Sequence, residues 1–187
     1  MSAQTETWPK PHRLTVDDYY RMAEAGVLSP DDRTELIEGE IIDMPPIGSV
    51  HAEVVRLLTR HLSRAVGESG VVSAQLPVRL SLRSEPQPDI ALLKPKPTGY
   101  RYAHPSANDV LLLIEVSDTT LRYDLGRKAR LYANHAVEEY WVVDLAANRV
   151  WRHRKPSRTR YIERTEISRG ELELPGQLGA VVVRELF

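Results

Sequence analysis

Two carboxylates and one lysine stand out in this chain because each is placed in or beside an apolar segment. Asp89 opens the run Ile90–Leu93, and Glu115 lies inside the run Val110–Ser117. A charged side chain in such a run is costly to bury unless it is paired or bound to a metal ion. Lys128 follows Glu115 in a short helical segment. Together these groups predict a divalent-metal hydrolytic site on a sheet.

Strand periodicity predicts which way the two carboxylates point. Alternate side chains of a strand share a face, so Glu115 should share its face with Leu113 and Ser117. Asp89 should share its face with Ala91 by the same rule. Both acids can therefore project from the sheet toward one layer.

The segment after Glu115 has the period of an amphipathic helix. Its expected inward stripe consists of Leu121, Leu125, Ala129, Tyr132 and Ala133. Lys128 lies at the edge of that stripe and should lean toward the sheet. Glu115, on the preceding strand, is the partner we expect for it.

Composition narrows the chemistry. The 187 residues include no cysteine, which excludes thiolate metal sites and cysteine nucleophiles. Oxygen-rich ligand sets favour Mg²⁺ or Mn²⁺. The net charge is −1, so any contact with nucleic acid must be local. No apolar run could span a bilayer and residues 1–11 carry no signal-peptide core, so we expect a cytoplasmic protein with no membrane partner.

The elements read as one α/β (α+β) domain over residues 14–187, after a flexible arm over residues 1–13. A capping box at Thr15 and Asp18 opens a short helix, and residues 35–43 read as a tight hairpin. The core order is helix, three strands, helix, strand. The corresponding ranges are 49–66, 71–82, 88–94, 110–117, the Lys128 segment and 139–144. Residues 71–82 read as a strand or a bent strand pair, since Pro77 interrupts them. Further strands are expected at 149–154, 161–165, 171–174 and 181–186.

The string from Pro88-Asp89 to Glu115-Val116-Ser117 resembles the PD-(D/E)XK nuclease superfamily. In that pattern a lysine stands two residues after the acid, where this chain has Ser117. Some branches take the lysine from the following helix, and Lys128 would fill that role. The wider order of acidic and aromatic residues to Asp144 is similar to the Uma-two-like branch of restriction-endonuclease-like proteins.

The resemblance implies a restriction-endonuclease-like core, a mixed central sheet flanked by helices, with an extra N-terminal helix and hairpin and extra C-terminal strands. It implies a metal-dependent endonuclease that hydrolyses DNA phosphodiester bonds with Mg²⁺ or Mn²⁺. Asp89, Glu115 and the Val116 carbonyl would hold the ion, and Lys128 would orient water or stabilise developing charge. A homodimer or higher homo-oligomer is also expected.

Other interpretations stay open at this stage. Glu115 and Lys128 could form a buried structural ion pair while Asp89 caps a turn. The protein could then be a catalytically silent nuclease-fold module that binds nucleic acid or a protein partner, or a structural domain that associates through its β-rich tail. The loop over residues 94–108 could be a lid, a DNA-facing flap or an ordinary connection.

Four accessory residues complete the expected site: Glu38, His51, Gln75 and Ser117. Glu38 could be a further acidic ligand or a solvated hairpin acid. His51 could face the cleft from the start of its helix or pack on the surface. Gln75 could reach water or phosphate. Asp118 is expected to be a turn or cap residue.

The most basic stretch runs from Arg149 to Tyr161. Its expected nucleic-acid contacts are Arg152, Arg154, Lys155 and Arg158. Basic residues that alternate with aromatic ones suit phosphate contact. The alternative is an edge hairpin whose charges prevent aggregation.

Overall fold

The fold was obtained as a computed structural model, which describes residues 9–29 and 31–187. Within these residues a six-stranded sheet has the order β3-β4-β5-β6-β7-β8. β5 (Val110–Ser117) and β6 (Glu139–Asp144) pair in parallel. The other neighbours are antiparallel: β3 (Val71–Ala74), β4 (Ile90–Leu93), β7 (Arg149–Pro156) and β8 (Tyr161–Ile167). The expected mixed α/β sheet is therefore confirmed.

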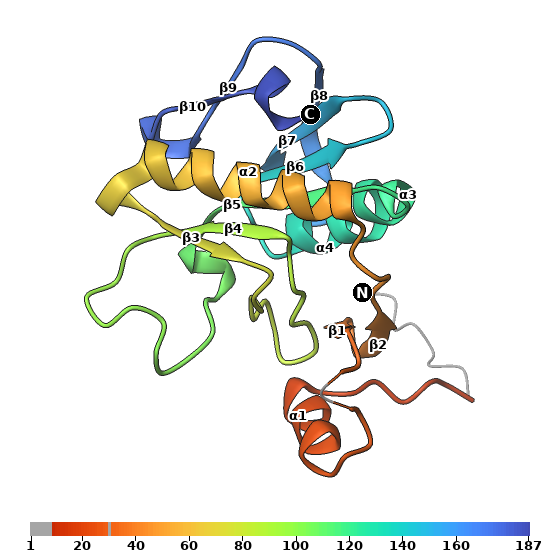
Figure 1. Ribbon diagram of the computed structural model, residues 1–187. Helices are drawn as coiled ribbons and strands as arrows, with labels where there is room; N and C mark the ends of the chain where they lie inside the picture. Colours follow the sequence, from red (N-terminus) through yellow and green to blue (C-terminus); the bar gives the residue numbers. More distant parts are fainter. Residues whose placement is uncertain (1–8, 30) are drawn as a thin grey trace, which may run out of the picture.

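One face of the sheet is covered by α2 (Ser49–Val66) and by the hairpin of β9 (Glu171–Glu173) and β10 (Ala180–Val182) (Figure 1). The core on this side includes Leu58, Ile114 and Trp141, all fully buried. The expected strand at 181–186 is shorter than predicted, because residues 183–186 turn into the 3-10 segment η5 (Val183–Leu186).

The opposite face is covered by the helical segment between β5 and β6. It consists of α3 (Leu121–Tyr123), the π-helical turn η3 (Asp124–Lys128) and α4 (Ala129–Asn134). Leu113 and Tyr132 belong to the core on this side, whereas Ile114 and Val116 belong to the core on the other. The predicted alternation along β5 is thus confirmed.

The N-terminal elements lie at one end of the sheet (Figure 1). α1 (Val16–Glu24) begins at Thr15, whose capping box with Asp18 is present as predicted. β1 (Thr34–Ile37) and β2 (Glu40–Asp43) form the predicted hairpin. Glu38 and Gly39 both have positive φ, as a tight two-residue hairpin turn requires.

The arm expected over residues 1–13 lies partly outside the described residues, which begin at residue 9. In the described part, Arg13 pairs with Glu40, and the Leu14 N–H donates to the Gly39 carbonyl at 3.0 Å. A side chain at Gly39 would meet the Cβ of Arg13 at 2.8 Å, so the approach to the hairpin needs a glycine there.

Of the strand or bent strand pair predicted over residues 71–82, only the first part is a regular strand. β3 ends at Ala74, and Gln75 has a φ of 53°. Pro77 cannot donate to a sheet ladder. The chain beyond it forms isolated bridges from Arg79 to Ser106 and from Ser81 to Ser84. This irregular stretch leads back to Asp89 at the start of β4.

No helix in the described ranges 9–29 and 31–187 has both the length and the hydropathy needed to cross a membrane. The longest, α2, has 18 residues and buries only one stripe, which includes Val54, Leu58 and Leu62. It therefore packs as a surface helix on the sheet.

We predict that Leu58→Ala lowers the free energy of unfolding by about 3 kcal/mol. Leu58 is fully buried on the inner face of α2, and its truncation leaves a cavity. Leu82→Ala is the matched control, since that side chain is 78% exposed, and it should change stability by no more than about 0.5 kcal/mol. Urea denaturation measures both. Equal effects would contradict the assigned core.

Candidate active site

A cavity of about 240 Å³ lies at the carboxyl end of β5, between the hairpin, the start of α2 and the α3–η3 segment. Its wall is rich in carboxylates. The acidic residues that line it are Glu35, Asp43, Asp89, Glu115, Asp118 and Asp124. The cations beside them are Lys128 and Arg33, with His51 as a titratable neighbour. The structure therefore brings Asp89, Glu115 and Lys128 together in one acidic cavity.

Asp89 is the residue immediately before β4, and it lines the cavity. Its Oδ2 accepts a hydrogen bond from the Val116 N–H at 2.8 Å, which ties β4 to β5. Its Oδ1 lies 2.9 Å from His51 Nε2 and accepts from the Gln75 side-chain amide at 3.4 Å. Three segments thus orient this one carboxylate, and His51 and Gln75 contact it directly.

Glu115 and Lys128 form the ion pair that the sequence predicted. Lys128 Nζ lies 2.9 Å from Glu115 Oε1 and 3.1 Å from Glu35 Oε2, and only 5% of Lys128 is exposed. The Tyr132 hydroxyl also donates to Glu115 Oε1, at 2.7 Å. Both of these bonds go to Glu115 Oε1 and neither goes to its Oε2.

The π-helical turn positions two cavity residues. Asp124 and Lys128 are its first and last residues, and both are buried. Asp124 Oδ2 accepts from the Ser117 hydroxyl at 2.7 Å and from the Thr120 hydroxyl at 2.6 Å. Single π-turns inside helices occur frequently at functional sites. Here the turn places one acidic and one basic residue, Asp124 and Lys128, on the wall of the same cavity.

Burial and charge shift the pKa values of these groups. Burial raises the pKa of Glu115 to about 8, with Asp89, Asp124 and Glu35 adding to the rise and Lys128 opposing it. Burial also raises the pKa of Asp124, which Lys128 opposes. Burial lowers the pKa of Lys128, but the surrounding carboxylates outweigh it and raise that pKa well above its usual value. Lys128 is therefore an ammonium, and the excess of carboxylates favours a further cation.

His51 is half-buried and its position on the cavity wall gives it one strong partner. Its hydrogen bond to Asp89 raises its pKa, and burial opposes the rise. An imidazolium here would stabilise the Asp89 carboxylate when no other cation is present. Of the two predicted locations for His51, the structure has the one that faces the cavity.

The carbonyl of Val116 faces the same side as Asp89. The N–H and C=O of one strand residue point to the same neighbouring strand, and the Val116 N–H points to Asp89. The Ser117 carbonyl points the other way, where it accepts from Leu145 N at 3.0 Å. Val116 can thus supply a main-chain oxygen beside the two carboxylates.

The donor set suits a hard divalent cation. In the described ranges, no three His, Asp or Glu side chains converge on one point as a metal-binding group. A ligand set of two carboxylates, from Asp89 and Glu115, and the Val116 carbonyl is all oxygen. Mg²⁺ and Mn²⁺ accept such sets and complete them with water. The residues present therefore fit the cation that the resemblance implies.

The family model described as "Uma2: Putative restriction endonuclease" matches residues 16–182. The chain belongs to the Uma2 family. No curated protein matches it. A crystal structure described as "a putative nuclease belonging to DUF820" from Anabaena variabilis ATCC 29413 has a TM-score of 0.72 to this chain. It is 16% identical and covers 93% of this chain and 97% of its own. The two proteins therefore share a fold.

Glu38 lies outside the cavity of this Uma2-family chain. It occupies the hairpin turn, its side chain is 42% exposed, and its carboxylate is 3.6 Å from Arg127. The hairpin acids that line the cavity are Glu35 on β1 and Asp43 on β2.

Two further cavity residues had no place in the predicted site. Asp124 lies four residues before Lys128, a spacing that puts both on one helix face, so the sequence could have indicated it. Tyr123 is half-buried, and its hydroxyl has no hydrogen-bond partner among the described residues. Burial raises its pKa to about 12, so it stays a hydrogen-bond donor.

The basic residues predicted to contact nucleic acid lie on β7 and in the following turn, and none lines this cavity. Arg152 pairs with Glu139 at 2.7 Å, and Lys155 pairs with Glu163 at 2.5 Å. Arg154 lies 3.8 Å from Glu139. Most of this predicted contact surface is therefore engaged in ion pairs along the sheet.

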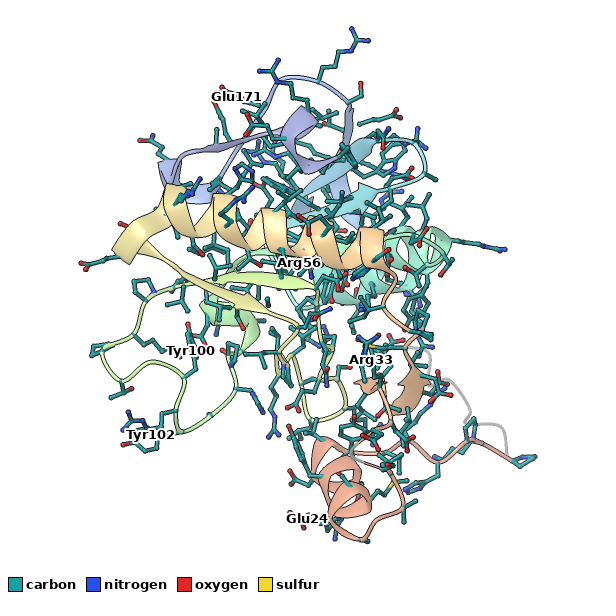
Figure 2. The ribbon with its side chains drawn as sticks, viewed as in Figure 1. Glu24, Arg33, Arg56, Tyr100, Tyr102 and Glu171 are labelled. Carbon is teal, nitrogen blue, oxygen red and sulfur yellow. The ribbon has the colours of Figure 1, made fainter. Side chains whose placement is uncertain are left out.

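The loop over residues 94–108 does not cover the cavity. Figure 2 shows Tyr102 at the far end of that loop, well away from Arg33 beside the hairpin. Arg33 lines the cavity and donates to the Pro45 carbonyl at 2.7 Å. Tyr102 is 82% exposed and lines a separate hollow with Tyr20 and Arg79. In this structure the loop is not a lid.

We predict that Lys128→Met destabilises the metal-free protein increasingly as pH rises. Without the ammonium, the folded pKa of Glu115 moves above the value of about 8 that it has beside Lys128, whereas the unfolded value stays near 4.5. A raised folded pKa gives stability at low pH that is lost as pH rises through that range. Below about pH 8 Glu115 is protonated in both folded proteins, so the deficit relative to wild type should change little; above pH 8 it should grow toward about 3–5 kcal/mol.

Urea denaturation between about pH 6 and about 10 tests this. Lys155→Met is the matched control, because it breaks an exposed ion pair with Glu163 and should cost no more than about 1 kcal/mol. A Lys128→Met deficit that stays constant with pH would show that Glu115 does not take up the proton.

Proposed function

We propose that this protein is a metal-dependent endonuclease that hydrolyses DNA phosphodiester bonds with Mg²⁺ or Mn²⁺. The observation that carries the proposal is the meeting of Asp89, Glu115 and Lys128 in one acidic cavity at the end of β5. The descriptions of the Uma2 family and of the Anabaena variabilis protein both name a nuclease, and they support the class of reaction.

Asp89, Glu115 and the Val116 carbonyl would hold the cation. When bound, such a cation makes a water more acidic and neutralises negative charge on a phosphate. Glu115 presents Oε2 for this purpose, since Lys128 and Tyr132 occupy Oε1. Glu35 and Asp124 do not need to ligate, because each already accepts hydrogen bonds that fix its position.

Lys128 supplies the positive charge of the protein itself. Its ammonium is held between Glu35 and Glu115, so it is fixed in place before any substrate arrives. From there it can donate to an attacking water or to a phosphate oxygen. The unpartnered Tyr123 hydroxyl on the same wall is a second donor for a phosphate oxygen.

His51 and Gln75 would act through Asp89. Both contact Asp89 Oδ1, and groups that hydrogen-bond to a ligating carboxylate hold it in position and tune its basicity. His51 would also compensate the charge of Asp89 in the metal-free protein.

The competing function is a catalytically silent module that binds nucleic acid or a protein partner. One observation favours it: Lys128 pairs with Glu35 and Glu115, and the Val116 N–H donates to Asp89, so contacts within the protein hold these three acids. Such a protein would bind DNA without cleaving it, and Asp89→Asn would leave that binding unchanged. The predicted homo-oligomer stays a prediction, which sedimentation at several concentrations would test.

We predict that Asp89→Asn lowers the rate of metal-stimulated cleavage by about 100-fold or more, because it removes one of two anionic ligands. The assay is cleavage of supercoiled plasmid with Mg²⁺ or Mn²⁺, and calorimetric titration with Mn²⁺ should show weaker binding by the variant. Asp17→Asn is the control, because Asp17 is an exposed acid on α1.

Two results would count against the proposal. One is cleavage that is equal in Asp89→Asn and Asp17→Asn. The other is wild-type protein that binds Mn²⁺ but cleaves neither plasmid nor linear duplex over a range of sequences.

A further inference from the structure

A second cavity, of about 370 Å³, lies on the same side of the sheet as the candidate active site. It is bounded by Gly126 and Ala129 of the helical segment, by His153 on β7, and by the turn and strand of β8. Three arginines line it: Arg130, Arg160 and Arg164. No Asp or Glu is among the described residues that line it.

These three arginines have no ion-pair partner among the described residues, unlike their neighbours. Along β7, Arg149 pairs with Asp144 and Glu166, and Arg152 pairs with Glu139. In a chain with a net charge of −1, uncompensated guanidinium groups gathered around one hollow are a local positive site.

Arg164 is also held in place. Its guanidinium lies 4.1 Å from the centre of the Trp151 ring, and Arg149 lies 4.8 Å from the same ring. A guanidinium that stacks on a ring keeps its N–H edge free to donate. The Trp151 ring therefore orients the Arg164 guanidinium and leaves its positive charge available to an anion.

One helical segment separates this cavity from the candidate active site. Asp124 and Lys128 line the acidic cavity, whereas Leu125 and Ala129, one residue further on, line the arginine cavity. Figure 1 shows this α3–α4 segment beside the strands β6 to β8. An α-helix with its side chains is about 10–12 Å wide, and phosphates of one DNA strand recur about every 3.4 Å along the axis.

We propose that Arg130, Arg160 and Arg164 bind backbone phosphates of the DNA whose scissile phosphate enters the acidic cavity. The site takes the phosphate groups about three or four nucleotides from the point of cleavage, on the other side of the helical segment. Arginine suits this role because its fork donates two hydrogen bonds to one phosphate. The proposal rests on the proposed function for the location of the scissile phosphate.

The contact is with the backbone and carries no base recognition. It also differs from the contact surface expected from sequence, since Arg152 and Lys155 are paired with acids. Arg160 lies at the end of the same turn as Arg158, but only Arg160 lines the cavity. The structure thus selects among arginines that the sequence could not distinguish.

The test is DNA binding by the full chain, measured by fluorescence anisotropy of a labelled duplex in EDTA, in an Asp89→Asn background so that no cleavage occurs. The double variant Arg130→Gln/Arg160→Gln is compared with Arg60→Gln/Arg169→Gln. All four residues are exposed and the two doubles change the net charge equally. Arg164 is left in place because of its contact with Trp151.

We expect the first double to weaken binding about tenfold or more and to lower the slope of log Kd against log salt by about two, one for each lost phosphate contact. The control double should leave the slope nearly unchanged. Equal losses in both doubles would mean that only bulk charge matters and would overturn the proposal. No loss in either, or no binding by the parent protein, would overturn it as well.

The outcome is separable from that of the proposed function. Binding that depends on Arg130 and Arg160 in a protein that never cleaves DNA would support this site and refute the nuclease. Cleavage by a protein whose salt slope is unaffected in the Arg130→Gln/Arg160→Gln double would support the nuclease and refute this site.

Discussion

The buried ammonium of Lys128 holds the candidate site together. It contacts Glu35 of the hairpin and Glu115 of β5 from the π-helical turn η3, with its side chain only 6% exposed. Three segments that are distant in sequence are therefore joined at one charge. A buried charge without partners would be very costly, so the hairpin, the strand and the helix must take these positions together. More carboxylates line the cavity than Lys128 pairs with, and this excess of negative charge favours the binding of a further cation.

The sheet explains why the lysine comes from a helix. β5 and β6 run parallel, and a parallel pair needs a crossover connection that packs on the sheet. Residues 121–134 form that crossover, and they cover the face from which Glu115 projects. Ser117, two residues after Glu115 on β5, carries no charge, and the ammonium beside Glu115 comes from the crossover. Ser117 instead donates to Asp124, which helps to fix the same turn.

Much of this arrangement could be predicted from sequence because it depends on local periodicity. The alternation along Val110–Ser117 placed Glu115 on the helix-covered face, and the helical period placed Lys128 at the inward edge. The cap at Thr15 and the hairpin were equally local signals. What could not be predicted depends on contacts between distant segments. The ion pairs that engage Arg152 and Lys155 and the approach of Glu35 to Lys128 depend on partners in other elements. The π-turn is also a tertiary outcome, since the residues that form it have ordinary helical spacing.

The bridge from Glu35 to Lys128 has a consequence for how the protein is made. During synthesis the hairpin leaves the ribosome long before residue 128, so Glu35 has no ammonium to meet until more than half of the chain has been translated. Domains assemble from the N-terminus as they emerge, but here the last charge needed to close the acidic cavity arrives late. Nascent chains that end before Lys128 therefore cannot form the complete acidic cavity.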